Sequence, residues 1–158
     1  MLKTMHKTPP ILSRRDVLSV GAGAVIVSAS PLRSFAAQAD LDRARKELFG
    51  DRPVTEGRVS LMLPPIAENG YSVPLSVDIE SPMTDQDYVK RVAILSPRNP
   101  LPLIAQFHFT PQSGRARVDA RIRMSGTQSI QAIAEMNDGS LWSGSRETVV
   151  TLAACVVL

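Results

Sequence analysis

The chain has 158 residues, of which 44% are hydrophobic, 4% aromatic and 21% charged, and it carries a formal charge of +3. This length and composition are typical of one globular domain. One cysteine cannot close a disulfide within the chain, and one cysteine with two histidines falls short of a self-contained zinc site. We therefore expect neither an internal disulfide nor a structural metal centre built by this chain alone.

The N-terminus is typical of a twin-arginine export signal. Arg14 and Arg15 precede a Gly- and Ala-rich apolar segment, which ends in small residues near Ala36. The uncharged stretch 17–32 is shorter than the roughly 20 residues that a membrane span needs. We predict that the signal is cleaved after Ala36 or Ala37 and that the protein is periplasmic, without stable membrane association. A retained N-terminal helix is the alternative.

Export changes the charge balance of the chain. Removal of residues 1–36 takes away five of the 18 basic residues and one of the 15 acidic residues, which leaves 13 and 14. The mature net charge is about −1, so the basic character belongs to the signal and gives no reason to expect nucleic-acid binding. Twin-arginine export usually carries proteins that fold or assemble before they cross the membrane, which is consistent with a co-exported partner.

A short helix is predicted at the start of the mature chain. Leu41, Ala44 and Leu48 recur at spacings of three and four residues. Asp40 can cap the N-terminal end of this helix, and Gly50 can end it. The sequence therefore predicts about ten helical residues.

After Pro53 the apolar period changes from 3.6 to 2, which predicts strands almost to the end of the chain. The expected strands are 58–63, 71–79, 89–95, 103–110, 115–124, 129–136 and 147–153. Turns are expected at 69–70, 99–100, 113–114 and 138–139. About seven strands at this spacing predict an all-β fold, an immunoglobulin-like antiparallel β-sandwich. Pro74 lies within a predicted strand, so an edge position or a bulge is expected there.

Cys155 is the only thiol, and it lies close to the C-terminus. One interpretation is a small apolar residue buried in the last strand, since valines and leucines surround it. The other is an exposed thiol that acts as a nucleophile or as a covalent attachment point. His108 is the only histidine of the mature chain, on the polar side of a predicted strand, and a structural or surface role is expected for it.

Four arginines, Arg115, Arg117, Arg121 and Arg123, share one face of a predicted strand. They form either a solvated sheet face or a surface that steers anions or binds a partner. No Gly-rich phosphate loop is present, and Asp85, Asp87 and Glu135 have no spacing that identifies an acid–base pair. No catalytic residue, metal site or cofactor site is predicted.

Several short blocks of sequence occur in order between about residue 40 and residue 155. The blocks are 66–70 (IAENG), 73–74 (VP), 81–84 (SPMT), 87–90 (DYVK), 107–111 (FHFTP), 113–116 (SGRA), 121–123 (RIR) and 134–140 (AEMNDGS). Together these blocks resemble the SoxY family, the sulfur-carrying subunit of the periplasmic thiosulfate-oxidising system.

This resemblance implies a carrier subunit and not an enzyme. It implies an immunoglobulin-like domain paired as a heterodimer with a SoxZ-like subunit, and sulfur intermediates held covalently on Cys155. A c-type cytochrome would couple thiosulfate to the thiol, and a hydrolase would release sulfate. The implied organisation is a signal peptide at 1–36, the SoxY domain at 37–150 and a cysteine-bearing tail at 151–158.

The C-terminal tail departs from the family pattern. The family arm is rich in glycine around its cysteine, whereas this chain ends Ala153-Ala154-Cys155-Val156-Val157-Leu158. Beta-branched valines restrict the backbone and add bulk. Three interpretations follow: a working sulfur carrier with a variant tail, a SoxY-like paralogue that binds SoxZ without efficient carrier activity, and a β-sandwich binding or scaffold protein with Cys155 buried.

Overall fold

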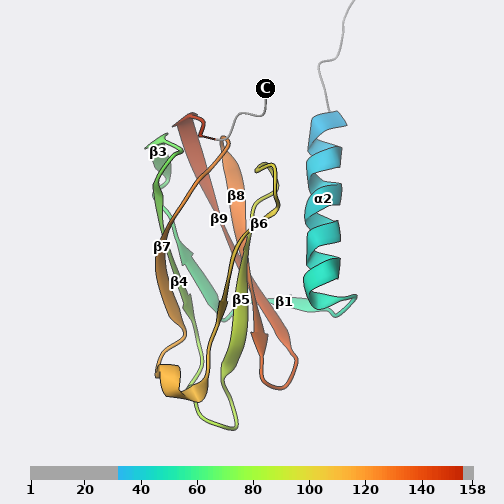
Figure 1. Ribbon diagram of the computed structural model, residues 1–158, viewed down its shortest axis with the longest axis vertical. Helices are drawn as coiled ribbons and strands as arrows, with labels where there is room; N and C mark the ends of the chain where they lie inside the picture. The colour runs from blue at the N-terminus through green and yellow to red at the C-terminus, as the bar shows by residue number, and fades with distance from the viewer. Residues whose placement is uncertain (1–31, 155–158) are drawn as a thin grey trace, which may run out of the picture. The chain divides into compact units, whose positions relative to one another are not determined.

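Alternating apolar residues fold into two facing β-sheets with a helix on the flank (Figure 1). The computed structural model describes residues 32–154, with side chains from residue 38 onward. The elements are α2 (Leu32–Phe49), β1 (Val54–Glu56), β2 (Val59–Met62), β3 (Ile66–Asn69), β4 (Val73–Ile79), β5 (Val89–Leu95), β6 (Leu103–His108), the 3-10 turn η1 (Pro111–Ser113), β7 (Arg117–Ile122), β8 (Gln128–Met136) and β9 (Leu141–Leu152).

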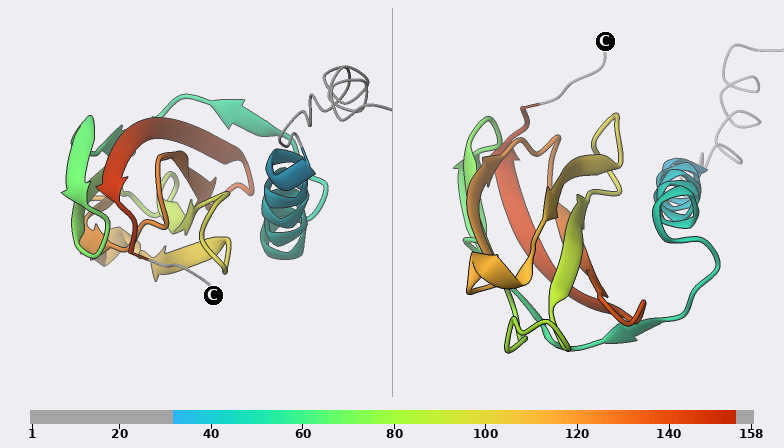
Figure 2. Two further views of the ribbon diagram at one scale, coloured as in Figure 1. Left: turned by 90° about the horizontal axis from the view of Figure 1, so that it is seen from above. Right: turned by 60° about the horizontal axis from the view of Figure 1, so that its bottom comes forward.

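The larger sheet has six strands and the smaller has three. The larger runs β1-β9-β8-β5-β6, with β3 also on β9, and the smaller runs β2-β4-β7. The sandwich is therefore confirmed, with one departure from a fully antiparallel arrangement. Both β1 and β3 pair in parallel with β9, one near each end of it, and the chain crosses to the smaller sheet between them as β2 (Figure 2).

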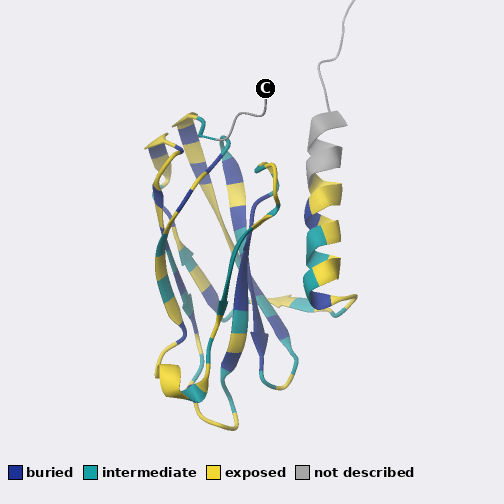
Figure 3. Ribbon diagram, viewed as in Figure 1, coloured by how far each residue is buried: buried dark blue, intermediate teal, exposed yellow. Residues whose placement is uncertain are grey.

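The strands of the larger sheet are buried more completely than a period of two predicts. Residues 92–95 and 132–136 are buried without alternation (Figure 3). One face of these strands lies in the core between the sheets. On the other face, Leu41 and Phe49 of α2 pack against residues such as Leu95 and Ile133. The helix covers this outer face, and sequence parity alone did not predict that.

The helix is longer at its N-terminal end than predicted. It begins at Leu32, and Asp40 lies inside it, paired with Arg43 at 3.0 Å, so Asp40 is not the cap. The preceding residues, mostly alanine and other helix-compatible types, allow the helix to extend. The prediction at the other end is confirmed, because Gly50 has φ +69° and its N–H donates to the carbonyl oxygen of Lys46 at 2.8 Å.

Two short strands and one long one differ from the sequence prediction. The three- and four-residue strands β1 and β3 were missed, because they are too short to show a period. Strand β9 begins at Leu141 and not near residue 147. Its first half was not predicted because it contains serine and glycine, which interrupt the apolar alternation.

Pro74 lies in β4 opposite Arg121 of β7. Strand β2 does not reach this part of β4, so β4 is locally an edge at Pro74, as predicted.

The predicted turn at Asp138-Gly139 is confirmed, and it joins the antiparallel strands β8 and β9. Gly139 has φ +86°, and the Met136 N–H donates to the Ser140 carbonyl oxygen at 2.9 Å as the chain turns from β8 to β9. Within residues 32–154, no helix combines the length and the apolar character that a membrane crossing requires.

Candidate functional site

The residues that the sequence singles out for function lie at the two ends of the chain. Arg14, Arg15 and Cys155 all fall outside the described residues, 32–154. Cys155 follows Ala154 directly in the sequence. The contacts that hold Ala154 therefore fix the position of the residue that precedes Cys155.

Three backbone hydrogen bonds hold the end of β9 at this point. Gly70 donates to the Leu152 carbonyl oxygen at 2.8 Å, Met124 donates to the Gly70 carbonyl oxygen at 2.9 Å, and Ala154 donates to the Met124 carbonyl oxygen at 3.0 Å. We call these four residues the tail mount. It joins three segments that are far apart in sequence: the β3–β4 connection, the β7–β8 connection and the end of β9, all at one end of the sandwich (Figure 1). The backbone of Ala154, which directly precedes Cys155, is therefore fixed in position.

Gly70 packs closely against two other residues of the tail mount. A Cβ atom at this position would lie 2.3 Å from the Met124 carbonyl oxygen and 3.1 Å from the Ala154 nitrogen. Any other residue would therefore push these segments apart. The sequence predicted Gly70 as a turn residue. The structure shows that this position also requires glycine because it has no room for a Cβ atom. The side chain of Asn69 supports the turn by accepting a hydrogen bond from the Tyr71 N–H at 2.7 Å.

Exposed apolar side chains lie in and beside the tail mount. Ile66, Tyr71, Val149 and Leu152 are all at least two-fifths exposed. Ile66 pairs with Val149 in the β3–β9 register, so these side chains belong to neighbouring parts of one sheet edge. This edge offers apolar surface next to the point where the tail begins.

Of the four arginines of the predicted face, Arg117 and Arg121 lie in β7, whereas Arg115 and Arg123 lie just outside its ends, and two of the four are neutralised. Arg115 pairs with Asp78, and Arg117 pairs with Asp119 at 2.9 Å. Hydrogen bonds from Arg117 and then from Ser76 lower the pKa of Asp119 to about 2. The hydrogen bond with Asp119 in turn raises the pKa of Arg117. Arg115 and Arg117 therefore form surface ion pairs with these two aspartates, and little positive charge remains beside them to bind an anion.

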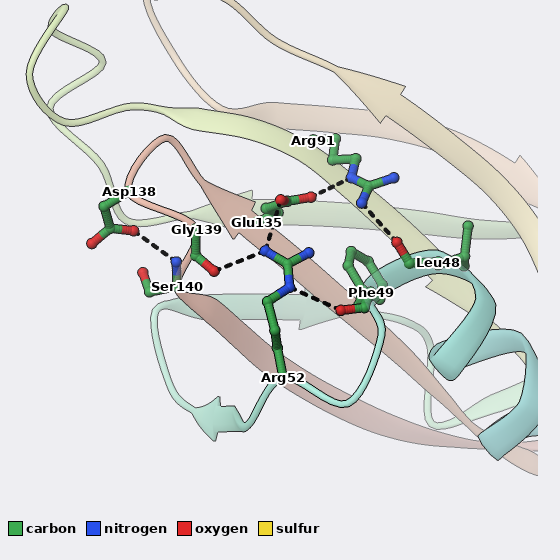
Figure 4. A network of polar contacts seen from close by, with 8 residues as sticks. All are labelled: Leu48, Phe49, Arg52, Arg91, Glu135, Asp138, Gly139 and Ser140. Atoms are coloured by element: carbon green, nitrogen blue, oxygen red, sulfur yellow. Dashed lines mark hydrogen bonds and ion pairs between the residues drawn. The ribbon is translucent and has the colours of Figure 1, made fainter.

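A second polar group ties the helix to the larger sheet (Figure 4). The carboxylate of Glu135, 6% exposed as a residue, accepts hydrogen bonds from Arg91 and from Arg52, the latter at 2.9 Å. These arginines also donate to the Leu48 and Phe49 carbonyl oxygens, both at 2.8 Å, at the C-terminal end of α2. The group therefore holds the end of the helix on the sheet.

The titration of Glu135 follows from these contacts. Burial on its own would raise the pKa of Glu135, but the hydrogen bonds from Arg52 and Arg91 outweigh burial, and the pKa lies below its ordinary value. Glu135 is thus an anchoring carboxylate. Sequence reasoning missed this group, although an acidic residue directly after the apolar run 132–134 was the available signal.

The other candidates from the sequence do not come together as a reaction centre. His108 is exposed, and its ring nitrogen Nε2 contacts the side-chain amide of Gln106 at 2.7 Å, which confirms a surface position. Asp85 is exposed, whereas Asp87 pairs with Arg58 at 3.5 Å. Within the described residues, no three histidine, aspartate or glutamate side chains are grouped so that they could hold a metal ion.

Comparison with known families decides the assignment. The sequence model of the family described as "Sulfur oxidation protein SoxY" matches residues 45–155 of the 158 residues. The chain belongs to the SoxY family. The match includes every strand of the sandwich and its last matched residue is Cys155. No curated protein matches the chain.

A solved SoxY structure agrees with this assignment. The sulfur carrier protein SoxY from Chlorobium limicola f thiosulfatophilum is 30% identical, with a TM-score of 0.62 over 73% of this chain and 99% of that one. The family and this carrier together indicate a carrier subunit and not an enzyme, as the resemblance implied.

More distant structures share the fold alone. A superoxide reductase (neelaredoxin) from Ignicoccus hospitalis is 14% identical, with a TM-score of 0.53 over 60% of this chain and 80% of that one. A putative superoxide reductase from Thermotoga maritima is 15% identical, with a TM-score of 0.50 over 63% and 87%. At such identities the shared sandwich says nothing about chemistry, because one fold supports unrelated functions.

Proposed function

We propose that this SoxY-family protein carries sulfur intermediates covalently on Cys155 during periplasmic thiosulfate oxidation. The observation that supports this most is the position of the only thiol. It is the first residue beyond Ala154, whose backbone is held by the tail mount, and it is the last residue of the family match. A tail that starts from a fixed point on a folded domain is suited to presenting a thiol to other proteins.

The proposed chemistry uses the thiol as an attachment point. Thiosulfate and the Cys155 thiol join through a new S–S bond, two electrons leave to a c-type cytochrome and one proton is released. The product is a thiosulfonate, –S–S–SO₃⁻. Hydrolysis by a partner enzyme then breaks the bond between sulfur and the sulfonate group, consumes water, releases sulfate and two protons, and leaves a persulfide anion on the cysteine. The carrier supplies no acid, base or metal for either step.

A SoxZ-like subunit is the proposed partner. Exposed apolar residues in and beside the tail mount supply surface that a folded partner could cover, namely Ile66, Tyr71, Val149 and Leu152. Purification of a tagged form from its native host should recover a SoxZ-like protein in equal amount. Recovery of a monomer under the same conditions would remove the heterodimer from the proposal.

Export by the twin-arginine pathway is the proposed route to the periplasm. Replacement of Arg14 and Arg15 by lysine should leave the unprocessed protein in the cytoplasm, detected by its mass and by cell fractionation. Normal processing of this double variant would contradict the route and leave the carrier chemistry untouched.

The loading reaction tests the carrier role. Cys155→Ser should abolish the mass increase that appears when the protein is mixed with thiosulfate, the c-type cytochrome and its oxidant. Ala153→Ser, a substitution of similar size two residues away, is the matched control and should load like wild type. Undiminished loading of Cys155→Ser would refute the proposal, because this chain has no other thiol.

The variant tail favours a second candidate function, a SoxY-like subunit with weak carrier activity. Val156 and Val157 stand where the family arm carries glycine. Wild-type protein that binds its partner but loads only after both valines are replaced by glycine would favour this second candidate.

A further inference from the structure

One arginine interrupts the apolar face that α2 turns toward the larger sheet. Leu41, Arg45 and Phe49 follow one another at intervals of four residues, so they lie on one side of the helix. Leu41 and Phe49 are buried in one cluster with Ile133 and Leu141 of the sheet. Arg45, which lies between them in the sequence, is half-buried. A charged residue at such a position requires polar surroundings.

The sheet supplies polar side chains on the same outer face. A Cβ atom on Gly144 would meet the backbone of β2 in the smaller sheet, so Ser143 and Ser145 on either side of it lie on the outer face. Gln131 of β8 pairs with Ser145 in the register. Glu56 of β1 pairs with Ser143. Paired residues share a face, so these four polar side chains lie on the face that α2 covers.

These side chains line one cavity between the helix and the sheet. Its volume is about 300 Å³, and its lining includes Arg45 from α2, Glu56 from β1, and Gln131, Ser143 and Ser145 from β8 and β9. Ser143 is only 8% exposed, whereas Glu56 and Ser145 are exposed, so the cavity opens to solvent on one side. Its volume lies at the lower end of the range for small-molecule sites, about 300–1,000 Å³.

The polar side chains of the cavity have no partners of their own. Elsewhere in the contact between helix and sheet, Glu135 is engaged by Arg52 and Arg91. Among residues 38–154, none of the five polar side chains of the cavity takes part in a side-chain hydrogen bond or an ion pair. Arg45 and Glu56 face the same cavity without pairing with each other. Partly buried polar groups normally have partners, so this set indicates a site for a polar ligand.

We propose that this cavity binds a small zwitterion of about the size of an amino acid, with its oxyanion group on Arg45 and its ammonium group on Glu56. A guanidinium donates charge-assisted hydrogen bonds to an oxyanion in a fixed planar geometry. The Glu56 carboxylate would repel a simple anion but accepts hydrogen bonds from an ammonium group. Gln131 and the two serines can donate to the ligand or accept from it. This site is separate from the carrier role, because Cys155 takes no part in it.

Binding in this cavity would stabilise the contact between helix and sheet. The ligand would contact α2, β1, β8 and β9 at once, and a ligand that binds only the folded protein raises its stability. Two charge-assisted contacts predict a dissociation constant on the order of 1 mM.

The test titrates the purified protein with a series of small zwitterions, followed by the NMR shifts of the backbone amides. The series is glycine, β-alanine and γ-aminobutyrate, which separate the carboxylate from the ammonium group by increasing distances. Propionate and propylammonium each carry one of the two charges. At least one zwitterion should shift the amides of Ser143, Gly144 and Ser145 and should bind more tightly than either singly charged compound.

Three variants assign the two charges of the ligand. Arg45→Gln should weaken binding of the zwitterion by about tenfold or more, because a charge-assisted partner is lost. Glu56→Gln should weaken the zwitterion and leave propionate unaffected. Arg43→Gln is the matched control, because Arg43 is an exposed arginine of the same helix that pairs with Asp40, and it should bind like wild type. Should Arg45→Gln fold poorly, Glu56→Gln provides the same comparison at an exposed position.

Each contrary outcome would overturn the proposal. No shift at residues 143–145 with any zwitterion, well above the predicted dissociation constant, would show that the cavity holds only water. Propionate that binds as tightly as the zwitterions would indicate a simple anion instead. Equal weakening in Arg43→Gln and Arg45→Gln would show a general effect of helix charge and no site. None of these outcomes bears on sulfur loading, so failure of this proposal leaves the carrier role standing.

Discussion

Gly70→Ala should release the cysteine-bearing tail from its mount. The added Cβ atom would lie 2.3 Å from the Met124 carbonyl oxygen, whereas such contacts essentially never fall below 3.0 Å, so the backbone must separate by about 0.7 Å. The bonds at 2.9 Å and 3.0 Å that involve Gly70, Met124 and Ala154 would lengthen past normal hydrogen-bond distance. Loss of one or two backbone hydrogen bonds at about 1 kcal/mol each predicts a destabilisation of about 1–2 kcal/mol.

Gly144→Ala is the matched control for this prediction. A Cβ atom there would lie 2.1 Å from the Val59 carbonyl oxygen, a similar overlap with backbone, at the crossing of β2 and β9. Both variants should lose stability in urea denaturation, but only Gly70→Ala should increase hydrogen exchange of the Ala154 amide and change the alkylation rate of Cys155. Equal exchange and alkylation in the two variants would refute the idea that Gly70 fixes the start of the tail.

Three further predictions concern other contacts. Glu135→Gln should lower the free energy of unfolding in urea by about 2 kcal/mol, less than the loss of a fully buried ion pair, because the arginine partners are partly exposed. The wild type should lose this extra stability as pH falls below 4.5, the ordinary pKa of a glutamate, because the pKa of Glu135 in the folded protein is lower. A variant whose stability changes with pH in parallel with the wild type would contradict this. Arg117→Gln should raise the pKa of Asp119 from about 2 toward 3.8 in an NMR titration, and an unchanged pKa would show that Ser76 suffices. Val156→Gly with Val157→Gly should increase the rate of thiosulfate loading by intact mass, because glycine restores backbone freedom; an unchanged rate would show that the valines do not hinder the tail.

The sandwich was predictable because its signals are local. Alternation within single strands and turn residues such as Asp138-Gly139 depend on a few neighbouring residues, and both were confirmed. The resemblance to SoxY was also readable from short blocks of sequence, and the family match confirmed it. The helix start was wrong at Asp40, because helix-compatible residues before it let the helix continue.

The parts that were not predictable depend on contacts between distant segments. Glu135 is buried with two arginines only because α2 covers the outer face of the larger sheet. Gly70 requires glycine for space because three segments cross there. The division of the arginine face follows from the β4–β7 register, which places Asp78 beside Arg117 and Pro74 beside Arg121. A parity argument places side chains on a face but does not give their partners.

The central claim is that sulfur is carried on Cys155. The most direct test is the intact mass of the mature protein, purified with its SoxZ-like partner from cells grown on thiosulfate, before and after a reducing agent. The account predicts mass additions that correspond to sulfur or thiosulfonate, that map to Cys155 and that disappear on reduction. An unmodified thiol that resists alkylation until the protein is denatured would contradict it and would indicate a buried residue in a protein that carries no sulfur.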